Sequence, residues 1–563
     1  MIYHCEDHTC NYWDEGEKLP ERCPQCGRKL LRANEADMTG DDWTALGNTL
    51  WDAEASDKKR MVDCFRKAAY LGSAWGVCNL GICMEQGNGV EADPVQAFWL
   101  YRQAVEMGSL NAVCCLGVCY QYGIGTAPDA KQAAELYCKA AEYGSPRGQM
   151  LLARAFHDGI GVEADAAEAV HWVRAAAYQR YGEGMYRLGV CYAYGDGVEQ
   201  NWEHAVHWFR EAAESGVSAA MTDLGYCYEK GCGVEQSWEQ AFSWYRRGAE
   251  CGYPVSMSNL GLCYKRGYGV EQNWQEAVKW YEQGAQCGHL QSMNNLAYCY
   301  ERGEGVEQNE DRALYWYRRG AEAGSDYCMY CLGWNYSNGE GVEQNMTEAI
   351  RWYTAAAEGG NADAMHDLGW HYDHGEGVEQ DMKKAICWYE RAAEQNHPAA
   401  MNSLGECYAM GRGVPRDLET AMEWYRRAAE LGEAMADYNM GWHLEQAGKL
   451  SEAYAHYRKA ADGNDDSAWW ALGRFYENGV VVAQDGKEAR RCYETGEKLG
   501  SVKCKMRLAR CKLLGIGGHR AKKAGLDLCR QALELAKESS EKEDYGYEAE
   551  MNLLRRTIAE NES

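Results

Sequence analysis

The 563-residue sequence predicts an all-α fold, an α-solenoid of about fourteen helix-pair repeats. Three observations predict it. A landmark leucine returns at a spacing of mostly 36 residues, a helix-start residue and a helix-stop residue keep a fixed distance from that leucine, and apolar residues recur at helical spacing in between. Because one helix pair cannot bury its own apolar face, the repeats are expected to stack on one another.

The landmark position defines each repeat, and we name each repeat after it and count positions from it. The landmarks are Leu46, Leu80, Leu116, Leu152, Leu188, Leu224, Leu260, Leu296, Leu332, Leu368, Leu404, Met440, Leu472 and Leu508. From Leu80 to Met440 every step is 36 residues.

The first helix of a repeat is clearest around Leu224. Ala220, Leu224 and Tyr228 recur at four-residue spacing and so share one helix face. Gly225 is expected where a neighbouring helix comes close, and Gly231 begins the glycine pair that ends the helix.

The second helix has a regular start and stop. Position +13 predicts an N-cap residue in ten repeats: Asp93, Asp129, Asp165, Asn201, Ser237, Asn273, Asn309, Asn345, Asp381 and Asp417. A Glu three residues later predicts a full capping box at Asp165, Asn273 and Asn345. Left-handed helix ends are predicted at Gly72, Gly108, Gly144, Gly216, Gly252, Gly288, Gly324, Gly360 and Asn396. Between start and stop, a Trp followed by Tyr or Phe is expected to fill the gaps between helix pairs.

The pattern LGxxYxxGxGVxx(D/N)xxxAxxWYxxAAExG resembles the Sel1-like repeat family, a relative of tetratricopeptide repeats, over roughly residues 40–530. The resemblance implies a right-handed superhelix whose first helices line a concave, ligand-binding surface. The expected domains are a small module over residues 1–37, the solenoid over 38–530 and C-terminal capping helices over 531–563.

The N-terminal module contains a candidate metal site. Cys23 and Cys26 form a Cys-x2-Cys knuckle, and Cys5 and Cys10 are the expected partner pair, with His8 as the alternative for one ligand. The segment resembles a zinc ribbon or a rubredoxin-like knuckle. Structural zinc is favoured over redox iron because nothing else in the sequence indicates electron transfer.

Eight repeats carry a cysteine at position +3, on the flank of the expected buried face. These are Cys83, Cys119, Cys191, Cys227, Cys263, Cys299, Cys407 and Cys511. Stacked helices about 8–10 Å apart are too distant for disulfides between neighbouring copies. We therefore expect buried free thiols rather than a redox or metal ladder.

The candidate ligand-binding residues lie on the side of the first helix that faces away from the landmark leucine. Position −1 supplies Asp223, Asn259, Asn295, Asp367 and Asn439, position −2 supplies His366, and position +2 supplies Tyr226, Tyr298, Trp334, Trp370 and Trp442. We call these three positions the first-helix face. Polar side chains beside outward aromatics predict a groove that binds a peptide, the alternative being aromatics packed against neighbouring first helices.

The net charge of −27 disfavours nucleic acid and anionic membrane as partners. With neither an N-terminal leader nor a membrane-length apolar run, the chain is expected to be cytoplasmic. The predicted function is a non-enzymatic adaptor or scaffold that binds a protein or peptide. The alternatives are an enzyme, such as a metal-dependent or β-lactamase-like hydrolase, and a self-assembling structural protein.

Overall fold

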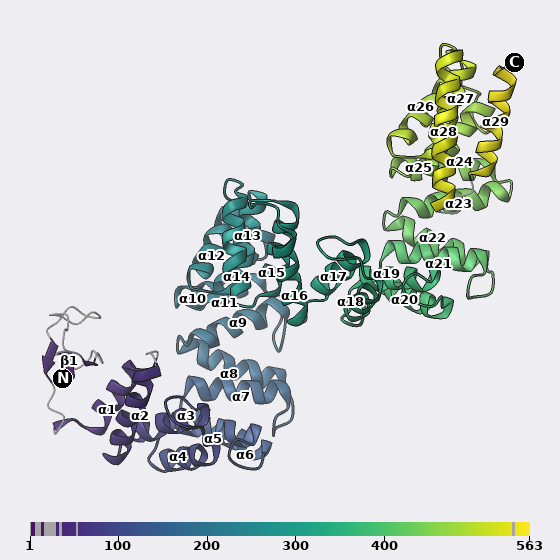
Figure 1. The fold of residues 1–563 in the computed structure, drawn as a ribbon. Coiled ribbons are helices and arrows are strands. Elements are labelled where there is room, and N and C mark those ends of the chain that lie inside the picture. Colours follow the sequence, from purple (N-terminus) through teal and green to yellow (C-terminus); the bar gives the residue numbers. More distant parts are fainter. Residues whose placement is uncertain are drawn as a thin grey trace. The chain divides into compact units, whose positions relative to one another are not determined.

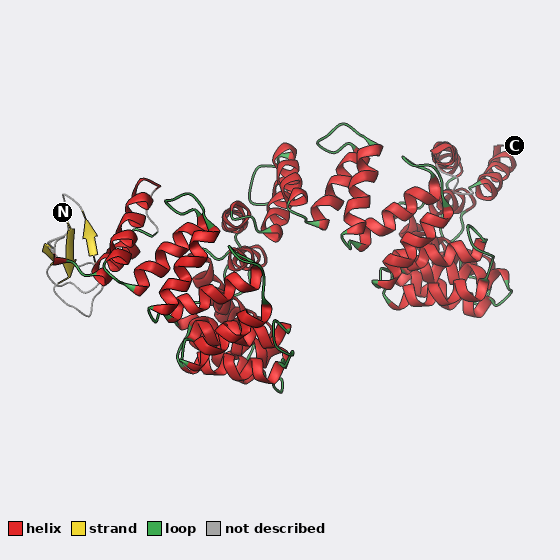
Figure 2. Ribbon diagram, turned by 90° about the horizontal axis from the view of Figure 1, so that it is seen from below, coloured by secondary structure: helices red, strands yellow, loops and turns green. Residues whose placement is uncertain are grey.

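The computed structural model describes residues 2–5, 13–15, 30–32, 37–51, 55–542 and 547–562. The chain forms two compact units, Met1–Ser292 and Met293–Ser563, which we call unit 1 and unit 2 and describe separately. In the described part, strands occur near the N-terminus and helices make up the rest (Figure 2).

Three short strands form an antiparallel sheet at the N-terminus of unit 1: β1 (Ile2–Cys5), β2 (Trp13–Glu15) and β3 (Leu30–Arg32). The strand order is β2-β1-β3, and Tyr3 of β1 lies opposite both Asp14 and Arg32. Cys5 is the last residue of β1, whereas the predicted ligands His8, Cys10, Cys23 and Cys26 lie outside the described residues. The zinc site therefore stays a prediction.

Unit 1 continues as a succession of helices (Figure 1). They are α1 (Gly40–Thr49), α2 (Ala55–Tyr70), α3 (Ala74–Gln86), α4 (Pro94–Glu106), α5 (Leu110–Tyr122), α6 (Ala130–Glu142), α7 (Pro146–Asp158), α8 (Ala166–Tyr178), α9 (Gly182–Tyr194), α10 (Trp202–Glu214), α11 (Ser218–Lys230), α12 (Trp238–Glu250), α13 (Pro254–Arg266) and α14 (Trp274–Gln286).

Helix α15 (Leu290–Arg302) begins at the end of unit 1 and leads into unit 2. The helices that follow are α16 (Glu310–Glu322), α17 (Asp326–Asn338), α18 (Met346–Glu358), α19 (Ala362–His374), α20 (Met382–Glu394), α21 (Pro398–Met410), α22 (Leu418–Glu430), α23 (Ala434–Gln446), α24 (Leu450–Asp462), α25 (Asp466–Asn478), α26 (Gly486–Lys498), α27 (Val502–Leu514), α28 (Lys522–Lys542) and α29 (Glu548–Glu562).

The helices of the described residues form fourteen consecutive pairs, from α1/α2 to α27/α28, with α29 after the last pair. Within each unit the two helices of a pair pack on each other, and the second helix packs on the first helix of the next pair. The predicted all-α solenoid of about fourteen helix pairs is confirmed.

The core of most repeats is an aromatic ring, usually of a tyrosine, packed on a glycine. In the Leu224 repeat, a Cβ atom added at Gly225 would lie 2.6 Å from Cε1 of Tyr245, so no side chain fits there. Tyr245 is 1% exposed, as expected for a residue in the centre of the stack. The neighbouring Trp244 is only half-buried, with the Arg247 guanidinium over its ring. The expectation that both aromatics fill the core is correct for the Tyr and only partly correct for the Trp.

All ten predicted N-caps are confirmed, because each side chain accepts a hydrogen bond from a backbone N–H of the first helical turn. The predicted capping boxes are wrong in their second half. The backbone N–H of Asn273 donates instead to the carbonyl of Tyr264 at 2.9 Å, and those of Asp165 and Asn345 make the same bond to the preceding helix. The Glu side chain therefore has no N-cap donor left to accept from.

The predicted helix ends are also confirmed. Every predicted stop residue has a positive φ, from 81° at Gly144 to 105° at Gly360, and Asn396 adopts 61°. Arg180, with φ 59°, and Asn464, with φ 66°, take the same left-handed conformation at aligned stops that lack the glycine. The core cysteines are buried as expected, except for the half-buried Cys191, and all eight are free thiols.

Candidate functional site

The predicted polar residues of the first-helix face are bonded to neighbouring first helices. The hydroxyl of Tyr330, at position −2, donates to Oδ2 of Asp367, at position −1 of the next repeat, over 3.2 Å. In the opposite direction, Nδ2 of Asn439, at position −1, donates to Oδ1 of Asn402, at position −2 of the preceding repeat, over 3.0 Å. Tyr186 also bonds Asp223, whose pKa is raised by burial despite that bond.

The three other predicted polar residues of this face are His366, Asn259 and Asn295. Nδ1 of His366 lies 3.0 Å from Oδ1 of Asp367, so the second oxygen of that carboxylate is also engaged. Asn259 makes no hydrogen bond within the described part of the chain, whereas Asn295 is half-buried and has contacts of its own. Most of this polar row therefore joins repeats to one another.

The predicted aromatic residues are open to solvent. In unit 2, Trp334 of α17 and Trp370 of α19 are 47% and 36% exposed, and Trp442 of α23 is 38% exposed. Tyr226 of unit 1 is 45% exposed, and Tyr298 is half-buried. Such exposure argues against the alternative in which these rings pack between first helices.

Each of these aromatics is flanked by a polar residue four positions on. The imidazole of His374 stacks on Trp370, with ring centroids 4.3 Å apart. The Lys230 ammonium lies 5.9 Å from the ring of Tyr226. The face therefore pairs an exposed π-surface with cationic or amide groups, a combination typical of surfaces that bind polypeptides.

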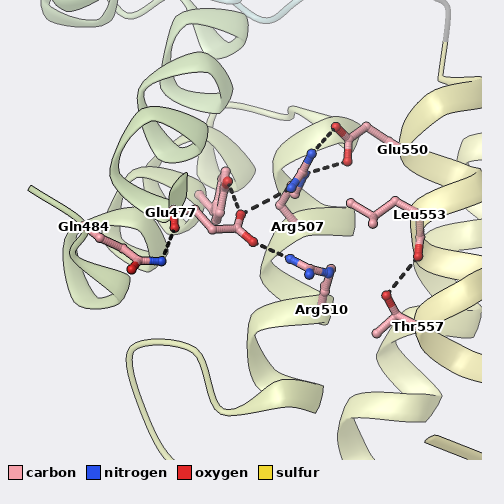
Figure 3. Close-up of polar contacts among 8 residues, drawn as sticks. Glu477, Gln484, Arg507, Arg510, Glu550, Leu553 and Thr557 are labelled. Atoms are coloured by element: carbon pink, nitrogen blue, oxygen red, sulfur yellow. Dashed lines mark hydrogen bonds and ion pairs between the residues drawn. The ribbon is translucent and has the colours of Figure 1, made fainter. Parts of the chain in front are cut away.

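In the last repeat, a residue of the first-helix face is bound by α29, the helix that follows the repeat. Figure 3 shows Arg507, at position −1 of α27, between Glu550 of α29 and Glu477 of α25. Arg507 donates two hydrogen bonds to the Glu550 carboxylate, over 2.6 and 2.7 Å, and one to Glu477 over 3.3 Å. Arg510, at position +2, is paired with Glu477. A segment that follows the last repeat thus binds the first-helix face through a carboxylate.

The Leu332 repeat shows what normally surrounds the buried ring. Tyr353 packs on Gly333, where an added Cβ would lie 2.6 Å from the ring. Tyr330, at position −2, lies beside the ring with centroids 5.9 Å apart. His371, at position +3 of the next repeat, lies 5.5 Å away on the other side.

The Leu152 repeat has no such ring. Val173 stands where the other repeats place Tyr or Phe, and Ala153 stands where most place the facing glycine. Within the described residues, the last repeat alone shares this combination, with Cys529 and Ala509 at the two positions. An alanine at this position does not by itself exclude the ring, because the Leu296 repeat has Ala297 there together with the buried Tyr317. The cavity therefore follows from the change at Val173.

The missing ring leaves a cavity of about 480 Å³ between α7, α8 and α9 of unit 1. Met150, Ala153, Val173 and Cys191 line its floor. These occupy the positions that surround the ring in the Leu332 repeat, so the cavity is a vacated ring site open to solvent. Its size is within the usual range for ligand pockets, about 300–1,000 Å³.

Charged side chains form the rim of this cavity. Nδ1 of His157 lies 2.7 Å from Asp158, and its Nε2 lies 3.2 Å from Asp196 beyond α9. The hydrogen bond to Asp158, aided by the charge of Asp196, raises the pKa of His157. Asp158 also accepts from Arg154 over 3.3 Å. Arg187 differs, since its guanidinium makes no hydrogen bond or ion pair with the residues that the structure describes.

The other candidates for metal binding or reactive chemistry in the described part of the chain are a pair of histidines and a cysteine. In the described ranges, no group of three or more His, Cys, Asp or Glu side chains could hold a metal ion. His371 and His374, three residues apart on α19, each bond a backbone carbonyl through Nδ1. Cys115 of α5 accepts from Arg147 over 3.6 Å, and hydrogen bonding with Cys78, together with the Arg147 charge, lowers the pKa of Cys115.

The sequence analysis missed the cavity, although its signal is readable in the sequence. Val173 breaks the series of Tyr or Phe at the ring position, and Ala153 is one of three alanines, with Ala297 and Ala509, in the glycine series. A comparison of positions across repeats would have identified both substitutions. That the two residues face one another, and that Arg187 lies at the mouth, depends on the stacking of helices.

Comparisons with known proteins agree with this architecture. The Sel1 repeat profile matches twelve consecutive segments between residues 76 and 501, including 146–181 and 182–217 around the cavity. No curated protein sequence gives a significant match to the chain.

Two solved structures of Sel1-type proteins are similar to the chain. One is a protective antigen of uropathogenic Escherichia coli with an SLR fold, 29% identical, covering 76% of this chain and 94% of the antigen with a TM-score of 0.54. The other is a Sel1 repeat protein from Oxalobacter formigenes, 29% identical, covering 56% of this chain and 94% of that protein with a TM-score of 0.43.

The fold and its repeated site define a helix-pair solenoid of the kind that typically serves as a protein-interaction scaffold. The chain belongs to the Sel1 repeat family. Within the residues described here, none of the helices is long and apolar enough to span a membrane.

Proposed function

We propose that this protein is a non-enzymatic scaffold that binds a polypeptide partner through the first-helix face of unit 2. The observation that carries the proposal is the exposure of Trp334 and Trp370 on neighbouring first helices, 47% and 36%, beside core tyrosines that are 2% exposed or less. Large aromatics at the centre of an interface supply most of its binding energy.

The chain itself supports a polypeptide as the ligand. Helix α29 lies against α27 and binds Arg507 of that helix through Glu550. The first-helix face can therefore accept a helix, with polar positions that fix it and apolar positions that it covers.

The test is affinity capture from the native host's lysate with three forms of the protein. These are the wild type, the variant Trp334→Ala/Trp370→Ala, and the control Trp99→Ala/Tyr315→Ala, which removes aromatics of similar exposure from second helices. Captured polypeptides are identified by mass spectrometry and then titrated in purified form, after circular dichroism has verified equal folding.

A partner retained by the wild type and the control, but bound at least about tenfold more weakly by the Trp334/Trp370 variant, supports the proposal. A partner bound equally by all three forms contradicts it. A captured second copy of this chain, with light scattering that rises with concentration, would favour the self-assembling alternative.

We also propose a structural zinc ion in residues 1–37, held by Cys5, Cys10, Cys23 and Cys26 or with His8 in place of one thiolate. The sheet supports this, because β1 ends at Cys5 beside the start of β3, which follows Cys26 closely in the sequence. Elemental analysis should find about one zinc per chain, lost in Cys23→Ser/Cys26→Ser. Full zinc content in that variant would contradict the assignment.

A further inference from the structure

We infer that the cavity of the Leu152 repeat is a second binding site, specific for a polypeptide segment that presents an aromatic side chain close to a carboxylate. The ring would fill the place vacated at Val173, and the carboxylate would pair with Arg187. The site lies wholly in unit 1 and uses none of the residues of the proposed Trp334/Trp370 surface.

The ring specificity follows from the shape of the repeat. In the other repeats the volume above position +1 is filled by a side chain from the second helix, such as Tyr137, which is 1% exposed. The backbone of the Leu152 repeat keeps the same helix pair and the same cap at Asp165, so the space persists although the ring is absent. Entry of an apolar group into an apolar cavity that is open to solvent is favourable, because it removes apolar surface from water.

The last repeat shows how the chain fills an equivalent vacancy. Ala509 and Cys529, at the glycine and ring positions, lie in one buried cluster with Tyr547, Met551 and Leu554. These three residues belong to the segment of α29, which follows the last repeat. Where the repeat omits its own ring, a segment outside that repeat thus supplies apolar side chains.

The carboxylate specificity follows from the same comparison. Arginine occupies position −1 at Arg187 and Arg507 alone among the fourteen repeats. Arg507 donates two hydrogen bonds to the Glu550 carboxylate of α29. Arg187 has no partner among the described side chains, and a bidentate pair with a carboxylate is the interaction for which a guanidinium is best suited.

The acidic residues on the rim do not satisfy Arg187. Asp158 and Asp196 are both engaged by His157, and Asp158 also by Arg154. Glu183 lies one turn before Arg187 on α9 but forms no ion pair with it. Arg187 is therefore the one cation of the rim that makes no hydrogen bond or ion pair with the described residues, and it lies beside the apolar floor.

The test uses the full-length protein and two small probes, 3-phenylpropionate, which joins a ring to a carboxylate, and its neutral amide, 3-phenylpropanamide. Binding is followed through the methyl resonance of Met150 on the cavity floor, assigned with Met150→Leu. The polypeptide arm is a blocked peptide of residues 547–561, which combines Tyr547 with Glu550, beside the same peptide carrying Glu550→Gln.

Three variants separate the contributions. Ala153→Gly/Val173→Tyr restores the glycine and ring of the other repeats and should abolish the Met150 shift for both small probes, with helicity retained and a higher thermal midpoint. Arg187→Gln should weaken 3-phenylpropionate by about tenfold and leave the amide unchanged. Arg180→Gln is the matched control and should change neither, because Arg180 lies outside the cavity lining and is already paired with Glu211.

Equal binding by the refilled variant would overturn the ring site, and equal loss of both probes in Arg187→Gln would overturn the carboxylate assignment. If the peptide fails to compete with 3-phenylpropionate, a polypeptide ligand is excluded. The inference rests on the proposed function only in taking a polypeptide as the ligand. The Trp334→Ala/Trp370→Ala variant should retain this site, so the two proposals can fail independently.

Discussion

The Leu116 and Leu152 repeats are neighbours in unit 1 with the same backbone plan and different contents. Both begin their second helix at an aspartate cap, Asp129 and Asp165. In the Leu116 repeat, Tyr137 fills the centre and its hydroxyl donates to Gln121 over 2.7 Å. In the Leu152 repeat, Val173 replaces the ring and a cavity opens to solvent.

The difference teaches that the helix pair and the ring are separate parts of the repeat. Caps and left-handed glycines define where the helices begin and end, and they act through the local backbone. The ring contributes packing energy and can be omitted while the helix pair is kept. A repeat that gives up its ring loses some stability and gains a binding cavity.

The largest expected contrast between the two repeats comes from truncating the residue at the ring position. Tyr137→Ala should lower the free energy of unfolding by about 3–5 kcal/mol, and Val173→Ala by about 1–2 kcal/mol, because the second removes less buried surface. Urea denaturation followed by circular dichroism measures both. Equal losses would mean that the ring is not the main packing element of the filled repeat.

The next contrast concerns the glycine that faces the ring. Gly117→Ala should cost about 1–3 kcal/mol, because the new Cβ would lie 2.5 Å from Cε1 of Tyr137. In a Tyr137→Val background the same substitution should cost at least about 1 kcal/mol less. A double-mutant cycle measures this coupling, and additive losses would mean that the side chain at position 117 does not contact the ring.

The caps should show no contrast. Asp129→Ala and Asp165→Ala each remove a side-chain acceptor at the same helix start, so each should cost about 1 kcal/mol. Matched urea titrations, with Asp129→Asn and Asp165→Asn as controls that keep the acceptor, test this. A clear difference between the losses of unfolding free energy in Asp129→Ala and Asp165→Ala would show that the cavity also destabilises the helix pair of its own repeat.

The smallest expected effect is a dependence on pH. The pKa of His157 is raised by Asp158 and Asp196, so its contribution to stability is present in full below the unfolded pKa and is lost as the pH rises through the folded pKa. Because the His157 side chain is 56% exposed, the change between about pH 6 and pH 8 should stay below about 1 kcal/mol. His157→Gln, which copies Gln121 of the filled repeat, should remove it. Unfolding midpoints of the wild type and of His157→Gln at the two pH values test this. If the pH dependence of stability is the same in both proteins, His157 is not its source.

The aromatic face was partly predictable from the sequence. Helical geometry correctly indicated that Trp334 and Trp370 point away from their own core. It could not indicate that Asp367 and Asn439 would bond the neighbouring first helix, because those partners lie more than thirty residues away along the chain. That pairing depends on how closely successive helix pairs approach.

The sequence by itself determined the number of repeats, the ends of their helices, the buried cysteines and the glycine at the close contact. These features depend on interactions within a few residues and on a period repeated so often that single exceptions do not obscure it. The tertiary structure alone decided that, where a repeat has a Trp-Tyr pair, the tyrosine rather than the tryptophan fills the core. It also decided that Val173 leaves an open cavity, and that Arg187 and Arg507 have different surroundings at the same position. Those outcomes depend on side chains from three helices meeting in space, and their distances are set by the stacking of repeats.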